Sequence, residues 1–541
     1  MSCRRVYNLW HCGSFRNVEK YGVLLSKHAH SRTFHTTRNA QQVTTNDGHS
    51  AEDNITDSEA SHRLVTFIQD RIRATGPLSV AEYMSIVLGA PKSGYYARQR
   101  ESKQNILGEA GDFTTSPELS QMFGELVGVF CRYAVRNCLG HASTKPWRYV
   151  ELGPGSGELA SDVLRTLSRL KERAENVEVN LVEISEHFRC EQAAKLLSTS
   201  DAYRYGRPAT SEPPPYEHEF RSRHNNYRIS WSESVESVEP EHFSVYVAHE
   251  FFDALPIHKF RRTDDSRGWR EILIGFDPSL GNYSDPTDPS NSSLYYTMAP
   301  VKTVAQMNYL TEDVLQMLGA NDDSSTVTDI EISPRSAAIA ETLARRVSMY
   351  GGVVLIVDYG YGANWDGSRL NKDAKPKGEN SHNNGDFVAH GNSVDNIVTA
   401  GDHQDIPRRP DSCTPRFQNN INYDTFRGFR DHRLAQSELE HVGTTDLTAD
   451  VNFGYLALAA APHALVMGPI TQGQFLGNLG IDVRCDMLLR QAKSDEQRKD
   501  VERCYEILVS DSEMGSRFKV MAFLPKIMER FIGHSPLAGF I

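Results

Sequence analysis

The chain has 541 residues, of which 39% are hydrophobic, and its formal net charge is −12 at pH 7. This length and apolar content suffice for one large decorated domain or two compact ones. The acidic balance argues against binding to nucleic acid or to an anionic membrane surface, because both attract basic proteins. The eight cysteines include no C-x-x-C pair, so the sequence predicts neither a disulfide framework nor a metal site.

The first forty residues differ in composition from the rest of the chain. They contain seven Lys or Arg against one acid, Glu19, and no apolar run long enough for a secretory signal. A basic, acid-poor leader of this kind is typical of a mitochondrial transit peptide. We therefore expect a transit peptide at 1–40, a polar linker at 41–57 and import into the mitochondrial matrix. No window reaches about 18 uninterrupted apolar residues, so no membrane-spanning helix is predicted.

Residues 58–146 follow a helical pattern. Apolar side chains recur at helix spacing in three stretches that begin at Leu64, Val80 and Met122, and we expect an N-terminal helical extension with these faces buried. Farther along this segment, Ser116-Pro117 is typical of a helix start, with Ser116 as the N-cap and the proline as the first helical residue.

Between residues 147 and 530 strands and helices alternate, which predicts parallel βαβ units and hence an open, doubly wound α/β sheet. The predicted strands are 149–152, 177–184, 227–231, 243–248 and 353–358, and the clearest helices are 158–170 and 333–350. A hairpin-like pair of strands interrupts this alternation between Trp269 and Met298. Two polar segments, near 203–226 and 363–422, have the composition of insertions, and the second is polar and long enough to predict disorder.

A glycine turn joins the first of these strands to a helix. Glycine lets a backbone turn sharply and lets a ligand approach closely, while the helix N-terminus offers free N–H groups. A dinucleotide-binding turn requires G-x-G-x-x-G, but its third position here is Glu158, whose carboxylate would oppose a pyrophosphate. The pattern instead favours S-adenosylmethionine, which has no phosphate and ends in an amino-acid group. An NAD-dependent oxidoreductase is the alternative, and nicotinamide binding without S-adenosylmethionine binding would reverse this ranking.

Acids at two successive strand ends support this cofactor. Glu151 stands directly before the glycines, and Glu183 ends the next strand, where a carboxylate can accept both ribose hydroxyls of an adenosine. We expect the S-adenosylmethionine site to include Glu151, Gly153, Gly155, Gly157 and Glu183.

Seven segments together resemble the MidA family of mitochondrial complex I assembly factors, which are described as protein arginine methyltransferases. They follow the family's order from about residue 60 to 525 and comprise 111–118, 151–157, 249–256, 358–360, 424–429, 444–450 and 480–484. The two polar insertions depart from the family pattern but replace no motif residue.

The resemblance implies a seven-strand, Rossmann-like S-adenosylmethionine-dependent methyltransferase sheet. It also implies symmetric dimethylation of an arginine on a core subunit of complex I. The segment that contains Asp112, Thr115 and Ser116 would then close over the cofactor. A methyltransferase fold that no longer catalyses, and acts as an assembly chaperone, is the alternative function.

Transfer of a methyl group from a sulfonium needs an acceptor held in line and little covalent help. A guanidinium stays protonated in proteins, so carboxylates are needed to orient it and polarise its charge. Glu250 and Asp253 follow strand 243–248 at the sheet edge where ligands bind, and we predict Glu250 as the guanidinium clamp and Asp253 as the second acid. His249 and His258 are candidates for a general base, and segment 424–429 is a candidate lining of the substrate groove.

We predict that replacing residues 363–422 by a short Gly/Ser linker leaves the melting temperature and the cofactor affinity nearly unchanged. So polar a segment contributes little buried area, and closing a flexible loop costs only about 0.6 kcal/mol more per doubling of its length. Thermal unfolding of the shortened and full chains is the test. A large drop in melting temperature would show that the segment folds onto the body.

Overall fold

The computed structural model describes residues 57–90, 93–97, 115–140, 145–206, 212–240, 242–263, 267–280, 293–321, 325–362, 423–430, 433–532 and 537–540. The expected transit peptide at 1–40, nearly all of the linker at 41–57, Asp112 and the insertion at 363–422 lie outside these residues. No helix in the described ranges is long and apolar enough to cross a membrane.

The central sheet confirms the predicted α/β fold class. Its strand order is β16-β17-β11-β6-β2-β3-β5-β4, with the short β15 paired to β11. The five strands β5, β3, β2, β6 and β11 are parallel, and β17 is antiparallel to both of its neighbours. Seven main strands therefore form the expected sheet, and β4 and β15 are short additions. The strands are β2 (Trp147–Leu152), β3 (Val177–Val182), β4 (Phe220–Arg221), β5 (Arg228–Ser232), β6 (Phe243–His249), β11 (Gly352–Tyr361), β15 (Val451–Asn452), β16 (Ala464–Thr471) and β17 (Phe518–Pro525).

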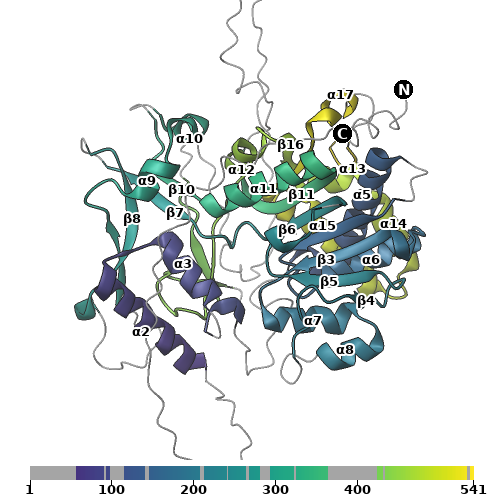
Figure 1. The fold of residues 1–541 in the computed structure, drawn as a ribbon, viewed down its shortest axis with the longest axis horizontal. Coiled ribbons are helices and arrows are strands. Elements are labelled where there is room, and N and C mark those ends of the chain that lie inside the picture. Colours follow the sequence, from purple (N-terminus) through teal and green to yellow (C-terminus); the bar gives the residue numbers. More distant parts are fainter. Residues whose placement is uncertain are drawn as a thin grey trace, which may run out of the picture.

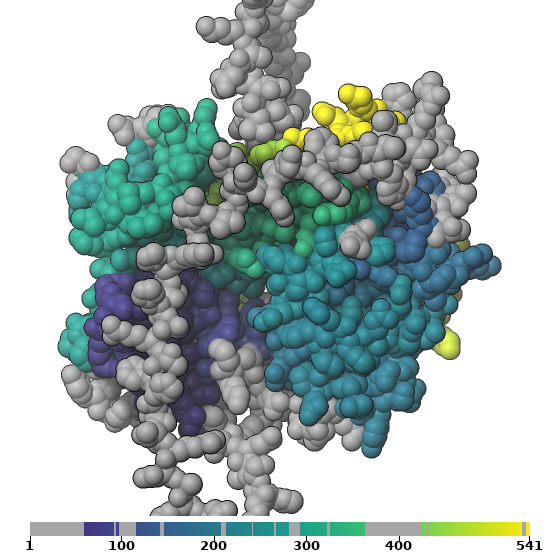
Figure 2. Space-filling model, viewed as in Figure 1, coloured from purple at the N-terminus to yellow at the C-terminus, as the bar shows by residue number. Residues whose placement is uncertain are grey.

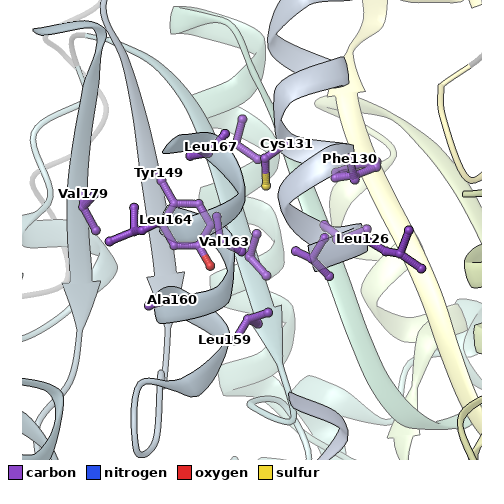
Figure 3. Packing of buried hydrophobic residues seen from close by; sticks show 14 of the residues in the cluster. Leu126, Phe130, Cys131, Tyr149, Leu159, Ala160, Val163, Leu164, Leu167 and Val179 are labelled. Atoms are coloured by element: carbon purple, nitrogen blue, oxygen red, sulfur yellow. The ribbon is translucent and has the colours of Figure 1, made fainter. Parts of the chain in front are cut away.

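Helices cover both faces of this sheet, because alternate residues of each buried strand point to opposite sides. On β2, Tyr149 belongs to one core cluster and Val150 to the other. The first face packs against α5 (Gln121–Leu139), α6 (Glu158–Arg169), α7 (Glu186–Leu196), α13 (Gln472–Asn478), α14 (Ile481–Gln491) and α15 (Asp495–Val509). The second packs against α11 (Pro334–Tyr350) and α12 (Phe453–Ala460). In Figure 3 the side chains of α6 fill the space between β2 and α5.

A second sheet lies beside the first. It is antiparallel, with the order β1-β8-β7-β10 and β9 paired to β8. Its strands are β1 (Leu78–Ser79), β7 (His258–Arg262), β8 (Trp269–Phe276), β9 (Leu294–Met298) and β10 (Asp329–Ile332). The hairpin-like pair expected between Trp269 and Met298 is therefore β8 and β9. A small third sheet consists of β12 (Arg427–Arg430), β13 (Arg433–Leu434) and β14 (Asp446–Thr448).

The extension expected at 58–146 divides between two cores. Helices α2 (Asp57–Thr75) and α3 (Val80–Gly89) pack with residues of the second and third sheets, whereas α5 packs on the central sheet. Figures 1 and 2 show α2 and α3, in purple, beside the second sheet, and Phe188 of α7 packs into the same core cluster. The segment is also not wholly helical, because Leu78 and Ser79 form β1 and pair with β8.

The remaining helices are short and lie between these larger elements. They are α4 (Ser116–Leu119), α8 (Thr199–Tyr205), α9 (Val304–Tyr309), α10 (Glu312–Met317), α16 (Met514–Arg517) and α17 (Glu529–Ile532). Part of the polar segment near 203–226 is ordered, since it ends α8 and forms β4.

We predict that Gly124→Ala lowers the free energy of unfolding by about 1–3 kcal/mol. Helices α5 and α6 approach so closely here that an added Cβ would lie 2.5 Å from the Cβ of Asp162. Denaturant unfolding measures the change. The matched control is Gly477→Ala in α13, where nothing lies within 4 Å of an added Cβ, and it should be neutral or slightly stabilising. Equal effects of the two substitutions would contradict the close approach.

Candidate functional site

The carboxyl ends of β2, β3, β6 and β11 meet at one edge of the central sheet. The chain leaves β2 toward β3 on one side, and β6 flanks β2 on the other, so the strand order reverses beside β2. Ligands of open α/β sheets bind outside such a reversal, at the carboxyl ends of the strands. Most of the predicted site residues described by the structure lie in the turns at this edge.

The glycine turn has left-handed backbone at each of its three glycines. The φ angles are +63° at Gly153, +52° at Gly155 and +82° at Gly157, a region that residues with a Cβ rarely adopt. A Cβ at Gly153 would also lie 2.8 Å from the ring of Phe251, in the loop after β6. The turn therefore requires glycine for its conformation, and at Gly153 also for the close approach of that loop.

A buried glutamine joins the turn to the predicted ribose acid. Gln192 in α7 donates from Nε2 to the carbonyl of Gly155 at 2.7 Å and to Glu183 at 3.3 Å. Its Oε1 accepts from the indole of Trp231 at 2.7 Å. The sequence offered no signal for this residue, because a glutamine within a helix belongs to no motif. Gln192 is thus a positioning residue for both parts of the expected cofactor site.

The two predicted cofactor acids are buried and carry raised pKa values. Glu151 accepts the hydroxyl of Tyr149 at 2.6 Å, and burial raises its pKa to about 8. Glu183 accepts the backbone N–H of Ser185 at 2.8 Å, and burial raises its pKa to about 7. A cation or hydroxyl donors beside these groups would favour their ionised forms. Their environment therefore fits a ligand with a cationic end and a ribose.

Helix α4 packs against the glycine turn. Ser156 in the turn donates to the carboxylate of Glu118 at 3.1 Å, and Glu118 also accepts the backbone N–H of Thr115 at 3.2 Å. The N-cap is Thr115, so the helix begins one residue earlier than predicted from Ser116-Pro117, because Glu118 completes a capping box with Thr115. Ser116 is buried, and its backbone N–H hydrogen-bonds to Glu250. The structure thus brings Thr115 and Ser116 to the predicted site.

Glu250 directly follows β6 with a left-handed backbone, at φ +48°. Such strain in a residue with a Cβ persists only where its surroundings hold it, and it clusters at functional sites. Burial, and secondly the charge of Asp253, raise the pKa of the Glu250 carboxyl well above its usual range. The side chain is thus poised to ionise when a cation arrives.

Asp253 lies in a hydroxyl-rich environment. Its carboxylate accepts the hydroxyls of Tyr359 and of Thr448, the latter at 2.9 Å. Arg427 also lowers the pKa of Asp253, although burial raises it overall. This arginine pairs with Asp450 at 2.6 Å and lies 5.3 Å from the ring centre of Tyr359. Segment 424–429 therefore reaches the site through Arg427. Tyr359 and Thr448 had no role in the sequence prediction, although each stands in a matching segment.

The two histidine candidates are separated by the fold. His249 ends β6 and stands beside Glu250, with 3.3 Å between Nε2 and Oε1. His258 begins β7 in the second sheet, where its Nδ1 lies 2.6 Å from Glu271. Glu271 also accepts the hydroxyl of Thr303. His258 therefore belongs to a structural cluster of the second sheet.

Glu158 argues less strongly against a dinucleotide cofactor than its sequence position alone predicts. It pairs with Lys195 at 2.5 Å, so its charge is compensated and its repulsion of a pyrophosphate is weaker than expected. The choice between cofactors consequently depends on the other acids and on the family. Within the described ranges, no group of three or more His, Cys, Asp or Glu side chains is arranged to hold a metal ion.

Comparison with known proteins identifies one family and one fold. A family model described as an S-adenosyl-L-methionine-dependent methyltransferase matches residues 129–373 and 415–470. Protein arginine methyltransferase NDUFAF7, mitochondrial, from Xenopus tropicalis is 32% identical over 90% of this chain and 90% of its own. The Homo sapiens protein of that name is 33% identical over 85% of this chain and 83% of its own. A COG1565 superfamily member from Burkholderia thailandensis, crystallised with S-adenosyl-homocysteine, shares the fold, with a TM-score of 0.57 and 21% identity over 87% of this chain and 94% of its own.

We predict that affinity for S-adenosylmethionine falls as the pH is lowered through about 7. The pKa of Glu183 is about 7 in the free protein. Since the hydroxyl-bearing ligand favours the carboxylate, protonation below this pH weakens binding, by up to about tenfold per pH unit. Calorimetric titration across neutral pH measures the slope.

In Glu183→Gln, affinity should be lower at alkaline pH and less dependent on pH, with a residual slope from Glu151, whose pKa is about 8. The matched control is Glu186→Gln in the first turn of α7, where the side chain is exposed. An unchanged slope in Glu183→Gln would remove this residue from the cofactor site.

Proposed function

Because the chain belongs to this family of S-adenosyl-L-methionine-dependent methyltransferases, we propose that it methylates an arginine side chain of a protein substrate. Two kinds of finding support the proposal. The relatives from frog and human are named protein arginine methyltransferases. The site, in addition, has the electrostatics that a guanidinium requires.

One observation carries the proposal: several carboxyl groups, buried or half-buried, lie together beside the glycine turn, and a nearby cation, Arg427, is already paired with Asp450. Glu250, Asp253 and Asp358 all have raised pKa values, burial being the main cause in each case, and the charges of neighbouring acids add to the shift at Glu250 and Asp358. Burying carboxylates is costly unless a cation compensates them. A guanidinium suits such a site because it stays charged in proteins and binds carboxylates through several N–H donors.

We assign the residues to two parts of one site. The glycine turn, with Gly153, Gly155 and Gly157, would hold S-adenosylmethionine together with Glu151 and Glu183. Thr115 and Ser116 would cover it from the side of α4, and the resemblance to the MidA family implies the same role for Asp112, which lies outside the described residues. When bound, this cofactor supplies an electrophilic methyl group on a sulfonium. Glu250 and Asp253 would bind the guanidinium and hold one nitrogen in line with that methyl.

We propose that the substrate is a core subunit of mitochondrial complex I and that the product is symmetric dimethylarginine, as the resemblance to the MidA family implies. The proposed compartment is the mitochondrial matrix. The basic, acid-poor leader at 1–40 and the word mitochondrial in the relatives' names support it.

A second candidate function is an assembly chaperone with an inactive methyltransferase fold. The glycines, Glu183 and Glu250 argue against it, because a chaperone has no need of a glycine turn or of acids withdrawn from solvent at the expected reaction edge. Fold alone does not decide between an enzyme and a chaperone, so the two must be separated by experiment.

We predict that Glu250→Gln lowers the single-turnover rate of methyl transfer by at least about 100-fold, as expected when one strong electrostatic contact to a transition state is lost. Affinity for S-adenosylmethionine should stay within about threefold, or roughly 0.6 kcal/mol. The assay incubates the protein with labelled methyl donor and a matrix protein extract, followed by analysis of methylated arginines. Glu175→Gln is the matched control, because the Glu175 side chain is 69% exposed.

Full activity in Glu250→Gln would exclude Glu250 from the site and make Asp253 the principal acid. If the variant transfers no methyl group and yet restores complex I assembly in cells, the chaperone function is correct and the enzymatic proposal is wrong. Product analysis tests the finer claim separately, since monomethylarginine or the asymmetric dimethyl form would contradict symmetric dimethylation.

A further inference from the structure

Two buried polar atoms face each other at the end of β6. Nε2 of His249 and Oε1 of Glu250 lie 3.3 Å apart, and within the part of the chain that the structure describes neither atom forms a hydrogen bond, with the other or with a third group. Unpaired polar atoms are costly to bury, and such pairs are uncommon in folded proteins. The two atoms are within hydrogen-bond distance but are not aligned, so a single proton satisfies both if the Glu250 carboxyl holds it and turns slightly to donate it to the ring nitrogen.

The surroundings favour the neutral form of both groups. Phe123 of α5 lies 4.8 Å from the His249 ring centre, and Phe518 of β17 is stacked at 6.4 Å with 14° between the planes. Burial in this apolar environment lowers the pKa of His249 to about 3. A neutral imidazole can accept a hydrogen bond at Nε2.

Three further carboxyl groups surround Glu250 and oppose its ionisation. They are Asp253 in the same loop, Glu118 of α4 and Asp358 of β11. The backbone N–H of Ser116 favours the carboxylate, but burial outweighs it. The backbone of Glu250 is also fixed, because its N–H donates to Val357 at 3.0 Å. The carboxyl group is therefore held next to His249 in surroundings that favour a protonated acid.

We propose that His249 is a positioning residue that makes Glu250 the acceptor of the proton released during methyl transfer. His249 accepts a hydrogen bond from the protonated carboxyl and so stabilises the state that Glu250 reaches after taking that proton. This inference rests on the proposed arginine methyltransferase function, and it identifies the proton acceptor that this function requires.

The guanidinium enters as a cation and favours the Glu250 carboxylate, which has given its proton to water. The attacking nitrogen forms a bond to the methyl carbon, while the bond from that carbon to sulfur breaks and its electron pair stays on sulfur. The proton on the nitrogen moves to Glu250, which then donates to His249. The methylated guanidinium keeps its charge but now faces a neutral Glu250, and this change favours product release.

The pH profile of methyl transfer tests the inference with two variants. His249→Phe keeps an aromatic ring between Phe123 and Phe518 but removes the acceptor. Since the protonated form of Glu250 is then less stabilised, the acid limb of the single-turnover rate should move to lower pH by about one unit, and the plateau should fall about tenfold. His249→Gln offers an amide oxygen near the position of Nε2 and should recover part of both losses.

A purely structural role for His249 gives a different result. The rate would fall without a shift of the acid limb, and His249→Gln would be no better than His249→Phe, which would overturn the inference. Cofactor titration on the same preparations controls for folding. In the Glu250→Gln background, His249→Phe should have little further effect, because the two residues act as one unit.

Infrared difference spectroscopy provides a readout that needs no substrate. The spectrum of the wild type minus that of Glu250→Gln should contain a protonated-carboxyl band at neutral pH, and the band should change in His249→Phe. If this band is present but no arginine is methylated, the proposed function fails and the proton-transfer role of the pair fails with it. If arginine is methylated and the band is absent, the function stands and the inference about His249 is wrong.

Discussion

The carboxylate of Asp358 holds the loop on which the rest of the site depends. It is completely buried at the carboxyl end of β11 and accepts the backbone N–H groups of Phe251 and Phe252, at 3.2 and 3.0 Å. These bonds fix the loop that carries Glu250 and Asp253, and they place the ring of Phe251 where only a glycine fits, at Gly153. The buried Asp358 carboxylate thereby holds the loop that carries Glu250 and Asp253 in contact with the glycine turn. Loss of this acceptor would leave two buried N–H groups without partners.

Segments far apart in the sequence complete the site around this loop. Helix α4 contacts the glycine turn through Glu118, and the third sheet supplies Thr448 and Arg427. The second sheet supports the segment that carries Arg427, because Glu331 of β10 accepts the backbone N–H groups of Thr425 and Phe426 at 3.0 and 2.9 Å. The two added sheets therefore contribute directly to the proposed site, since the third sheet supplies side chains to it and the second sheet holds the segment that carries Arg427.

Glu250 and Asp253, the two acids of the loop after β6, have different environments, and this difference suggests different roles for them. Asp253 accepts two hydroxyl groups and the backbone N–H of Ala254 and lies near Arg427, so four interactions favour its ionised form, although burial still raises its pKa. Glu250 has one stabilising backbone N–H and faces other carboxyl groups and a neutral imidazole. Pairs of titratable groups whose pKa values are pushed apart are typical of acid–base assignments in enzymes. More groups therefore favour the ionised form at Asp253 than at Glu250, and Glu250 is the better suited of the two to accept a proton.

Sequence alone determined the elements whose signals are local. The strands that became β2, β3, β5, β6 and β11 were located to within a few residues, because short apolar runs and the glycines after β2 are readable without knowledge of the fold. Glu151 and Glu183 could be proposed for the cofactor site for the same reason, since each stands at a strand end. Only the tertiary structure decided which polar residues meet. Gln192 joins the turn to Glu183, Tyr359 reaches Asp253 across 106 positions of the sequence, Lys195 compensates Glu158, and His258 lies in another sheet. These contacts depend on how strands and loops distant in the chain pack together, and side-chain spacing along the sequence carries no record of that packing.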